Sequence, residues 1–258
     1  MRPVFIADTC IGGLSVLKSL WDVGRAADAI FMADYEVNPL GQKSDSAIAR
    51  VVGRWLELVR KESDMLVVAC NTLSIRYHQL LGADQRQSGP GQVVSMVDCF
   101  RAMAEREADR LADRNVLIIG TQFTASQALY PDLLNAAVSG ARVATVDATE
   151  LERRIARFEA WSSTDDSVLT SELRRALDKT DVAILACTCF PMAKTELQSL
   201  YPRVEFLDPG AHCPALLGES ETAGRRSLAI RVTGNAVPPD HVTEFAKSYL
   251  DDASAVFG

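Results

Sequence analysis

Short apolar runs alternate with longer amphipathic segments along the whole chain. The runs Met65–Ala69 and Val182–Ala186 are apolar at every position, which is typical of parallel strands that are covered on both faces. Between such runs lie segments like Ser44–Lys61, whose apolar residues recur at the spacing of one helix face. This alternation predicts an α/β fold built on mostly parallel sheets.

The expected elements cover most of the chain. We expect strands at residues 4–6, 29–32, 65–69, 93–97, 116–119, 143–146, 182–186 and 204–207. We expect helices at residues 14–20, 44–61, 99–112, 124–137, 149–160, 165–178 and 191–200. No apolar run approaches the roughly 18 residues that a membrane-spanning helix requires, so we expect a soluble chain without a membrane partner.

Two stretches of the chain repeat each other's pattern. Asp64–Thr72 (DMLVVACNT) is similar to Asp181–Cys189 (DVAILACTC), and each places a cysteine directly after an apolar strand. A weaker echo relates Val4–Thr9 to Leu117–Thr121, again a strand that ends in a small or hydroxyl residue. A repeat of this kind predicts two similar α/β halves.

Composition and charge exclude several classes of function. The 258 residues include 27 Lys and Arg against 34 Asp and Glu, a net charge of −7, without a basic block that would bind nucleic acid. The six cysteines are too sparse for a secreted disulfide framework, and the N-terminus lacks a signal-peptide pattern. We therefore expect reduced thiols and a cytoplasmic protein. With three histidines and only Cys187 and Cys189 as a close cysteine pair, we expect no metal site.

The two repeated cysteines are the candidate chemical groups. Ligands bind beyond the carboxyl ends of parallel strands, which is where Cys70 and Cys187 stand. If the two halves face each other, the thiols lie on opposite sides of a small ligand. One thiolate then removes a proton from a carbon centre while the other thiol returns one from the opposite face. The alternative interpretation is that each cysteine is a small core side chain.

Polar residues beside these strands suit a small carboxylate ligand. Asn71, Thr72 and Thr188 offer neutral donors that hold a carboxylate without a charged side chain. Asp8 ends the first strand, where it either orients a substrate ammonium, handles protons or simply caps the next turn. The following Thr9 precedes a glycine pair that lets the backbone approach a ligand, but the G-x-G-x-x-G pattern of a dinucleotide site is absent.

At these residues the chain resembles the cofactor-independent aspartate/glutamate racemase superfamily and, within it, the glutamate racemases. The motifs that carry the resemblance span nearly the whole chain: Asp8–Val16 (DTCIGGLSV), Asp34 with Asn38–Ser44 (NPLGQKS), Ala69–Thr72 (ACNT), Gly120–Thr124 (GTQFT) and Cys187–Pro191 (CTCFP). The family counterparts read D-S-G-I-G-G-L-S-V, D…P-Y-G-x-K-S, A-C-N-T, G-T-x-x-T and C-T-H-Y-P.

The resemblance implies a fold, a reaction and a set of site residues. It implies two α/β domains related by a pseudo-twofold axis, with the active site in the cleft between them; we expect residues 1–95 plus 209–258 in one domain and 96–208 in the other. It implies interconversion of L- and D-glutamate by Cys70 and Cys187 without pyridoxal phosphate or metal, which supplies D-glutamate for peptidoglycan. By position, Asp8 assists the first thiol, and Glu150 or Glu152 is the assisting glutamate of the second half. The residues expected to line the amino-acid site are Thr9, Pro39, Leu40, Gly41, Asn71, Thr72, Thr121, Thr124 and Thr188.

Three departures from the family pattern leave the substrate open. Thr9 and Cys10 replace serine and glycine, Leu40 replaces tyrosine, and Cys189 replaces the histidine beside the second cysteine. A thiol is a poorer general acid or base near neutrality than imidazole. The alternatives are a racemase-fold decarboxylase or isomerase, a racemase of another small carboxylate, or a catalytically weakened binding protein. A small amino acid or dicarboxylate is the expected partner, and a homodimer is an open possibility.

Overall fold

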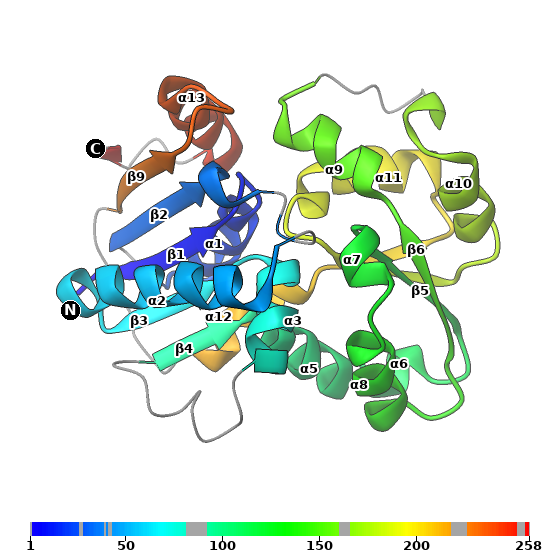
Figure 1. Ribbon diagram of the computed structural model, residues 1–258. Helices are drawn as coiled ribbons and strands as arrows, with labels where there is room; N and C mark the ends of the chain where they lie inside the picture. The colour runs from blue at the N-terminus through cyan, green and yellow to red at the C-terminus, as the bar shows by residue number, and fades with distance from the viewer. Residues whose placement is uncertain are drawn as a thin grey trace.

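Two parallel sheets lie side by side in the computed structural model, which describes residues 2–25, 28–38, 40, 43–80, 92–159, 166–217, 226–251 and 256–257 (Figure 1). The larger sheet has the order β10-β9-β2-β1-β3-β4 and the smaller one β6-β5-β7-β8. Every pair of neighbouring strands is parallel. The strands are β1 (Val4–Asp8), β2 (Asp28–Asp34), β3 (Met65–Val68), β4 (Gln92–Ser95), β5 (Asn115–Gly120), β6 (Arg142–Asp147), β7 (Val182–Ala186), β8 (Glu205–Leu207), β9 (Ser227–Thr233) and β10 (Val256–Phe257).

Helices connect consecutive strands, so the expected α/β class with two parallel sheets is confirmed. The helical elements are α1 (Gly13–Asp22), η1 (Tyr35–Val37), α2 (Asp45–Glu62), α3 (Asn71–Leu80), α5 (Met96–Arg106), α6 (Ala108–Leu111), α7 (Gln122–Ala125), α8 (Leu129–Ala137), α9 (Thr149–Ala156), η3 (Asp166–Val168), α10 (Ser171–Leu177), η4 (Phe190–Ala193), α11 (Lys194–Leu200), η5 (Pro209–His212), α12 (Cys213–Leu216) and α13 (Pro239–Leu250). Within the described residues, no helix has the length and apolar character needed to cross a membrane. The domain boundaries expected from the sequence stay a prediction.

The structure corrects one strand–helix boundary that the apolar pattern blurred. Residues 93–97 were expected to be one strand, but β4 ends at Ser95 and α5 begins at Met96. The Ser95 side chain accepts the backbone N–H of Asp98, and the Asp98 carboxylate accepts the backbone N–H of Ser95, which forms a capping box. This cap starts the helix inside an apolar run whose hydrophobicity alone favours a longer strand.

The central strand of the larger sheet is covered on both faces. Phe5 packs in one hydrophobic cluster with Trp55 of α2, whereas its neighbour Ile6 packs in another with Leu14 and Leu17 of α1. Successive strand residues point to opposite faces, so a helix on each side buries them all. The second of these clusters continues into the smaller sheet through Leu185, so the junction between the two sheets is itself part of the core.

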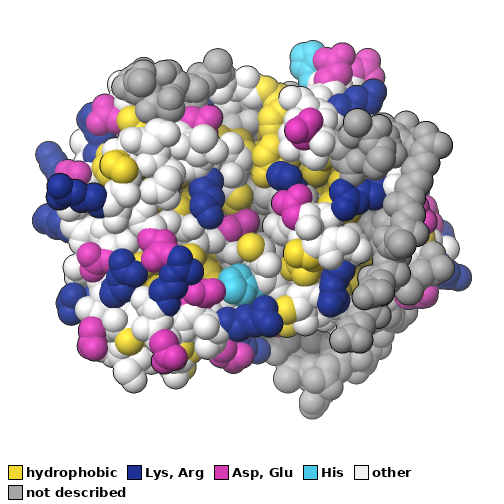
Figure 2. Space-filling model, turned by 180° about the vertical axis from the view of Figure 1, so that it is seen from behind, with side chains coloured by type: hydrophobic (Ala, Val, Ile, Leu, Met, Phe, Trp, Pro, Cys, Tyr) yellow, Lys and Arg dark blue, Asp and Glu magenta, His cyan; other side chains and the backbone are white. Residues whose placement is uncertain are grey.

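The surface carries charges of both signs. On the face seen in Figure 2, basic and acidic side chains are interspersed rather than gathered by sign. Some of them form ion pairs, such as Arg231 with Glu62 at 2.5 Å and Arg114 with Glu205 at 3.2 Å. This distribution agrees with the low basic charge of the sequence, which does not favour nucleic-acid binding.

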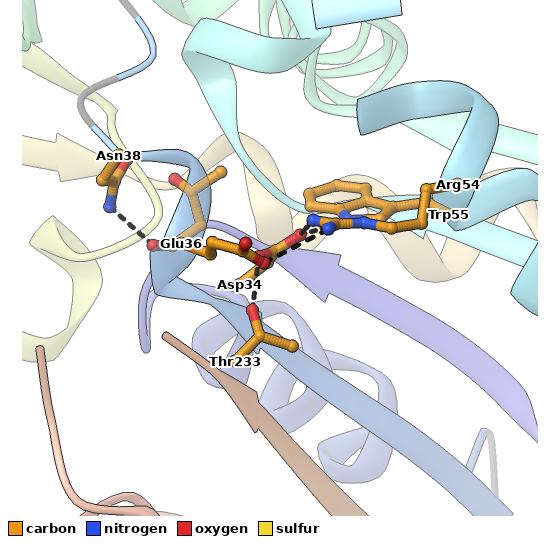
Figure 3. A network of polar contacts seen from close by, with 7 residues as sticks. Asp34, Glu36, Asn38, Arg54, Trp55 and Thr233 are labelled. Carbon is orange, nitrogen blue, oxygen red and sulfur yellow. Dashed lines mark hydrogen bonds and ion pairs between the residues drawn. The ribbon is translucent and has the colours of Figure 1, made fainter. Parts of the chain in front are cut away.

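A buried carboxylate ties β9 to its neighbour β2 in the larger sheet. Asp34, at the end of β2, is fully buried and accepts a hydrogen bond from Trp55 Nε1 at 2.8 Å. Arg54 and Thr233 also donate to its two oxygens, so that α2, β2 and β9 meet at one side chain (Figure 3). Just beyond, Asn38 donates to the backbone carbonyl of Thr9 at 2.6 Å, which links this network to the end of β1.

Replacement of Asp34 by alanine is expected to destabilise the protein strongly. Asp34→Ala leaves the buried Trp55 N–H and the Thr233 hydroxyl without their acceptor, and we expect it to lower the free energy of unfolding by about 3 kcal/mol. Chemical denaturation measures this change. The matched control is Glu36→Gln, because Glu36 is an exposed partner of the same Arg54 and its loss is expected to cost less than about 0.5 kcal/mol. Equal effects of the two variants would contradict the argument.

Candidate active site

The two repeated cysteines occupy equivalent places in the two sheets. Cys70 lies between the end of β3 and the start of α3, and Cys187 lies between β7 and η4. Both β3 and β7 are next to the first strand of their own half, β1 and β5 respectively. Both residues are buried, with 8% and 9% of their surface exposed.

The dipeptide Asp8–Thr9 lies between the two cysteine turns. The hydroxyl of Thr9 is 3.5 Å from the sulfur of Cys70. Thr188, which follows Cys187, donates its hydroxyl to the Asp8 carboxylate at 3.0 Å. Two adjacent residues at the end of β1 thus reach one cysteine turn from each half of the molecule.

Asp8 is a buried carboxyl group that titrates near neutrality. It is 1% exposed and accepts the backbone N–H of Thr9 at 2.6 Å in addition to the Thr188 hydroxyl. Burial raises the pKa of Asp8 to about 7, against the opposing effect of these hydrogen bonds. A carboxyl group with such a pKa exchanges protons readily at neutral pH.

The Cys70 thiol is held in its protonated form at neutral pH. Burial raises its pKa above the ordinary value for cysteine, and the nearby Asp8 carboxylate adds to this effect. The backbone N–H of Leu73 and the hydroxyl of Thr9 act in the opposite direction. In this arrangement Cys70 is suited to donate a proton, and hydrogen bonds are in place to receive the thiolate that remains.

Neutral polar groups from both halves meet near Cys70. The hydroxyl of Thr72 lies 3.5 Å from that of Thr121, which in turn lies 3.4 Å from that of Thr124. Asn71 is buried and its side-chain oxygen accepts the Tyr130 hydroxyl at 2.6 Å. Its amide nitrogen is buried without a hydrogen-bond partner among the described residues. A buried amide donor that is left over in this way is available to a ligand carboxylate.

Of the two candidate glutamates, one lies beside the site and the other does not. Glu152 has a carboxylate oxygen within 4.8 Å of the sulfurs of both Cys10 and Cys189, and burial raises its pKa. Glu150 is half exposed and pairs with Arg153 at 3.5 Å on the surface of α9. Of the two, Glu152 therefore lies against the buried thiols of Cys10 and Cys189.

Cys10 and Cys189, two of the departures from the family pattern, are in contact with each other. Their sulfur atoms are 3.3 Å apart, with Cys189 fully buried and Cys10 5% exposed. The third departure, Leu40, is 3% exposed and packs in a hydrophobic cluster with Cys70 and Leu73. Pro39 and Gly41, which were also expected at the site, lie outside the described residues.

Three residues that sequence reasoning missed support the site from behind. Tyr130 orients Asn71, and Asn38 holds the carbonyl of Thr9. The Ser15 hydroxyl lies 2.9 Å from the carbonyl oxygens of both Gly12 and Thr188 and shares its one proton between them. No local signal identifies Tyr130, because it stands in an ordinary amphipathic helix. Ser15 belongs to the motif Asp8–Val16, where its hydroxyl was the available signal.

Comparison with known proteins agrees with this geometry. A model of the Asp/Glu/Hydantoin racemase family matches residues 27–213. The chain is 31% identical over 212 residues to the glutamate racemase of Vibrio campbellii, covering 81% of this chain and 76% of that protein. It is 28% identical over 218 residues to the glutamate racemase of Sinorhizobium fredii, covering 81% and 79% of the two chains.

Solved structures share the fold. Glutamate racemase from Campylobacter jejuni subsp. jejuni superposes with a TM-score of 0.78 at 19% identity, over 97% of this chain and 99% of that one. Glutamate racemase from Francisella tularensis in complex with D-glutamate superposes with a TM-score of 0.71 at 18% identity, over 99% and 95% of the two chains. The family model covers well over half of the residues, so the chain belongs to the Asp/Glu/Hydantoin racemase family, as its motifs predicted.

Proposed function

We propose that this chain interconverts L- and D-glutamate by proton transfer at the α carbon between Cys70 and Cys187. The observation that carries the proposal is the placement of two thiols at equivalent strand ends, with Thr9 in contact with Cys70 and Asp8 in contact with Thr188, the neighbour of Cys187. The reaction needs no pyridoxal phosphate and no metal, because each thiol supplies one half of the proton transfer. The relatives named glutamate racemase support glutamate as the substrate.

The proposed reaction moves one proton off and another on. One cysteine, as its thiolate, takes the α proton and becomes a thiol, and the electron pair of the broken C–H bond stays on the substrate. The other cysteine, as its thiol, gives its proton to the opposite face and becomes a thiolate. The product has the opposite configuration, and the two cysteines have exchanged protonation states, ready for the reverse substrate.

The polar groups of the site suit a dicarboxylate amino acid. The free amide nitrogen of Asn71 and the hydroxyls of Thr72 and Thr121 are donors for carboxylate oxygens. Asp8 is the acidic group for the substrate ammonium or for assistance to the first thiol. Thr188 donates its hydroxyl to Asp8 and, as the residue after Cys187, lies in the turn that faces the substrate in this proposal.

The contact between Cys10 and Cys189 favours a second candidate, a racemase of another small carboxylate. These two cysteines stand where the family pattern has glycine and histidine, so the groups that can assist Cys187 are different. A chirally resolved assay over a panel of amino acids and dicarboxylates separates the two candidates. For either one we expect cytoplasmic residence, and for glutamate a role in peptidoglycan supply; a homodimer stays a prediction.

Loss of either repeated thiol is expected to abolish racemisation. Cys70→Ser and Cys187→Ser replace a thiol by a hydroxyl that is far too weak an acid, and we expect each to lower turnover by about 10³-fold or more. The control is Cys99→Ala, a buried cysteine of α5, which is expected to keep its turnover. Circular dichroism checks that the variants fold. Full activity of either serine variant would overturn the two-thiol mechanism.

Isotope labelling tests the mechanism without a mutation. Starting from L-glutamate in deuterium oxide, newly formed D-glutamate is expected to carry deuterium at the α carbon while the remaining L-glutamate initially keeps its hydrogen. The reason is that the proton removed by one thiol is not the proton delivered by the other. Chiral separation with mass spectrometry measures both pools. Deuterium that enters both enantiomers equally early would point to a single base.

Substitution of the family residues is expected to raise turnover on glutamate only when positions 10 and 189 are changed together. Cys189→His alone brings an imidazole into space that the Cys10 side chain occupies, and we expect it to lower turnover on glutamate. The double variant Cys10→Gly, Cys189→His removes that obstacle and is expected to exceed the single variant by about tenfold. Initial rates with glutamate measure both. Equal rates for the single and double variants would show that the two positions are not coupled.

A further inference from the structure

We propose that Cys10, Glu152 and Cys189 form a binding site for a thiophilic divalent cation of the zinc class, where the two halves meet. The proposal goes beyond the proposed racemase activity and does not depend on it, because cation binding is measured without turnover. It also revises the expectation from the sequence that the chain has no metal site.

The three side chains come from separate parts of the chain and converge. Cys10 lies in the turn between β1 and α1, Glu152 on α9, and Cys189 directly before η4. Their two sulfurs and one carboxylate oxygen all lie within 4.8 Å of one another, and the sulfurs are 3.3 Å apart. Tetrahedral zinc, with bonds of about 2.3 Å to sulfur and about 2.0 Å to oxygen, holds its ligand atoms about 3.5 to 3.8 Å apart. Small side-chain adjustments therefore produce a coordination site.

The donor set selects the kind of cation. Two thiolates and one carboxylate suit Zn²⁺. They do not suit Mg²⁺ or Ca²⁺, because those cations prefer sites made of oxygen donors. Binding converts two thiols into thiolates and releases two protons, with no change of oxidation state. The fourth position is open to water or to Asp8, one of whose oxygens lies 4.0 Å from the Cys10 sulfur.

A second observation points to a ligand at the same place. The hydroxyl of Tyr35 is buried and has no hydrogen-bond partner among the described residues, and only 9% of this residue is exposed. Tyr35 belongs to the same hydrophobic cluster as Cys10 and Cys189. A buried hydroxyl without a partner in this cluster is suited to a water molecule held by a cation, which would satisfy it.

Occupation of this site would affect the neighbouring catalytic thiol. Cys189 is a hydrogen-bond neighbour of Cys187, and Cys10 is two residues from Asp8. A cation that joins Cys10 to Cys189 ties the turn after β1 to the turn after β7 and takes the Cys189 sulfur, the hydrogen-bond neighbour of Cys187, as a ligand. We therefore expect reversible inhibition of turnover by Zn²⁺, relieved by a chelator.

Cobalt titration of the full chain, kept reduced, is the direct test. Thiolate ligands produce an intense near-ultraviolet charge-transfer band on Co²⁺, and we expect it to saturate at one cation per chain and to be displaced by Zn²⁺. Cys10→Ser and Cys189→Ser are expected to weaken binding by about 100-fold and Glu152→Gln by about tenfold. The matched controls Cys70→Ser, Cys187→Ser and Cys99→Ala keep the band. Its absence in the parent protein, its survival in both Cys10→Ser and Cys189→Ser, or its loss in Cys187→Ser would overturn the proposal.

X-ray absorption on the zinc-loaded parent protein tests the same site without a variant. We expect two sulfur ligands at about 2.3 Å and the remainder oxygen or nitrogen at about 2.0 Å. A shell without sulfur, or with three or more sulfurs, would overturn the assignment. If the protein binds the cation but does not racemise, the cation site stands and the proposed function fails. If it racemises but does not bind the cation, the proposed function stands and the cation site fails.

Discussion

A hydrogen bond from the Thr188 hydroxyl to the Asp8 carboxylate joins the carboxyl ends of β1 and β7, one strand from each sheet. Gly12 makes this approach close: a Cβ at that position would lie 2.4 Å from the Thr188 oxygen and 2.8 Å from the backbone of Cys189. Any larger residue would force the two turns apart. The placement of Cys70 beside Thr9 and of Thr188 beside Asp8 links the two cysteine turns through one dipeptide at the end of β1.

The fold and the strand-end positions of the two cysteines were predictable because their signals are local. Fully apolar strands such as Met65–Val68 are visible in any short window, and the repeated cysteine context marks their carboxyl ends. The convergence of Cys10, Glu152 and Cys189 was not predictable, because it depends on how two sheets pack across more than one hundred residues of chain. The same holds for Tyr130, whose hydroxyl reaches Asn71 only after α8 has docked.

The contact between Cys10 and Cys189 changes how the departures from the family pattern are understood. Seen in sequence, a glycine and a histidine are each replaced by cysteine at unrelated positions. In the structure the two sulfurs are in contact. Cysteine is larger than the glycine of the family pattern at position 10 and smaller than its histidine at position 189, so the two replacements change the volume in opposite directions. The two positions therefore belong to one packing contact, and a change at either one is felt at the other.

The position of β9 between β2 and β10 has a consequence for synthesis of the chain on the ribosome. The strands β5 to β8 have all been made by Leu207, so the smaller sheet can assemble first. The larger sheet begins earlier, with β2 beside β1, but the other edge of β2 has to wait for β9, which ends at Thr233. Until then that edge of Ala29–Ala33 is unpaired, and such an edge invites aggregation. The nascent chain therefore carries this open edge from the completion of β2 at Asp34 until β9 has been made, which is most of its synthesis.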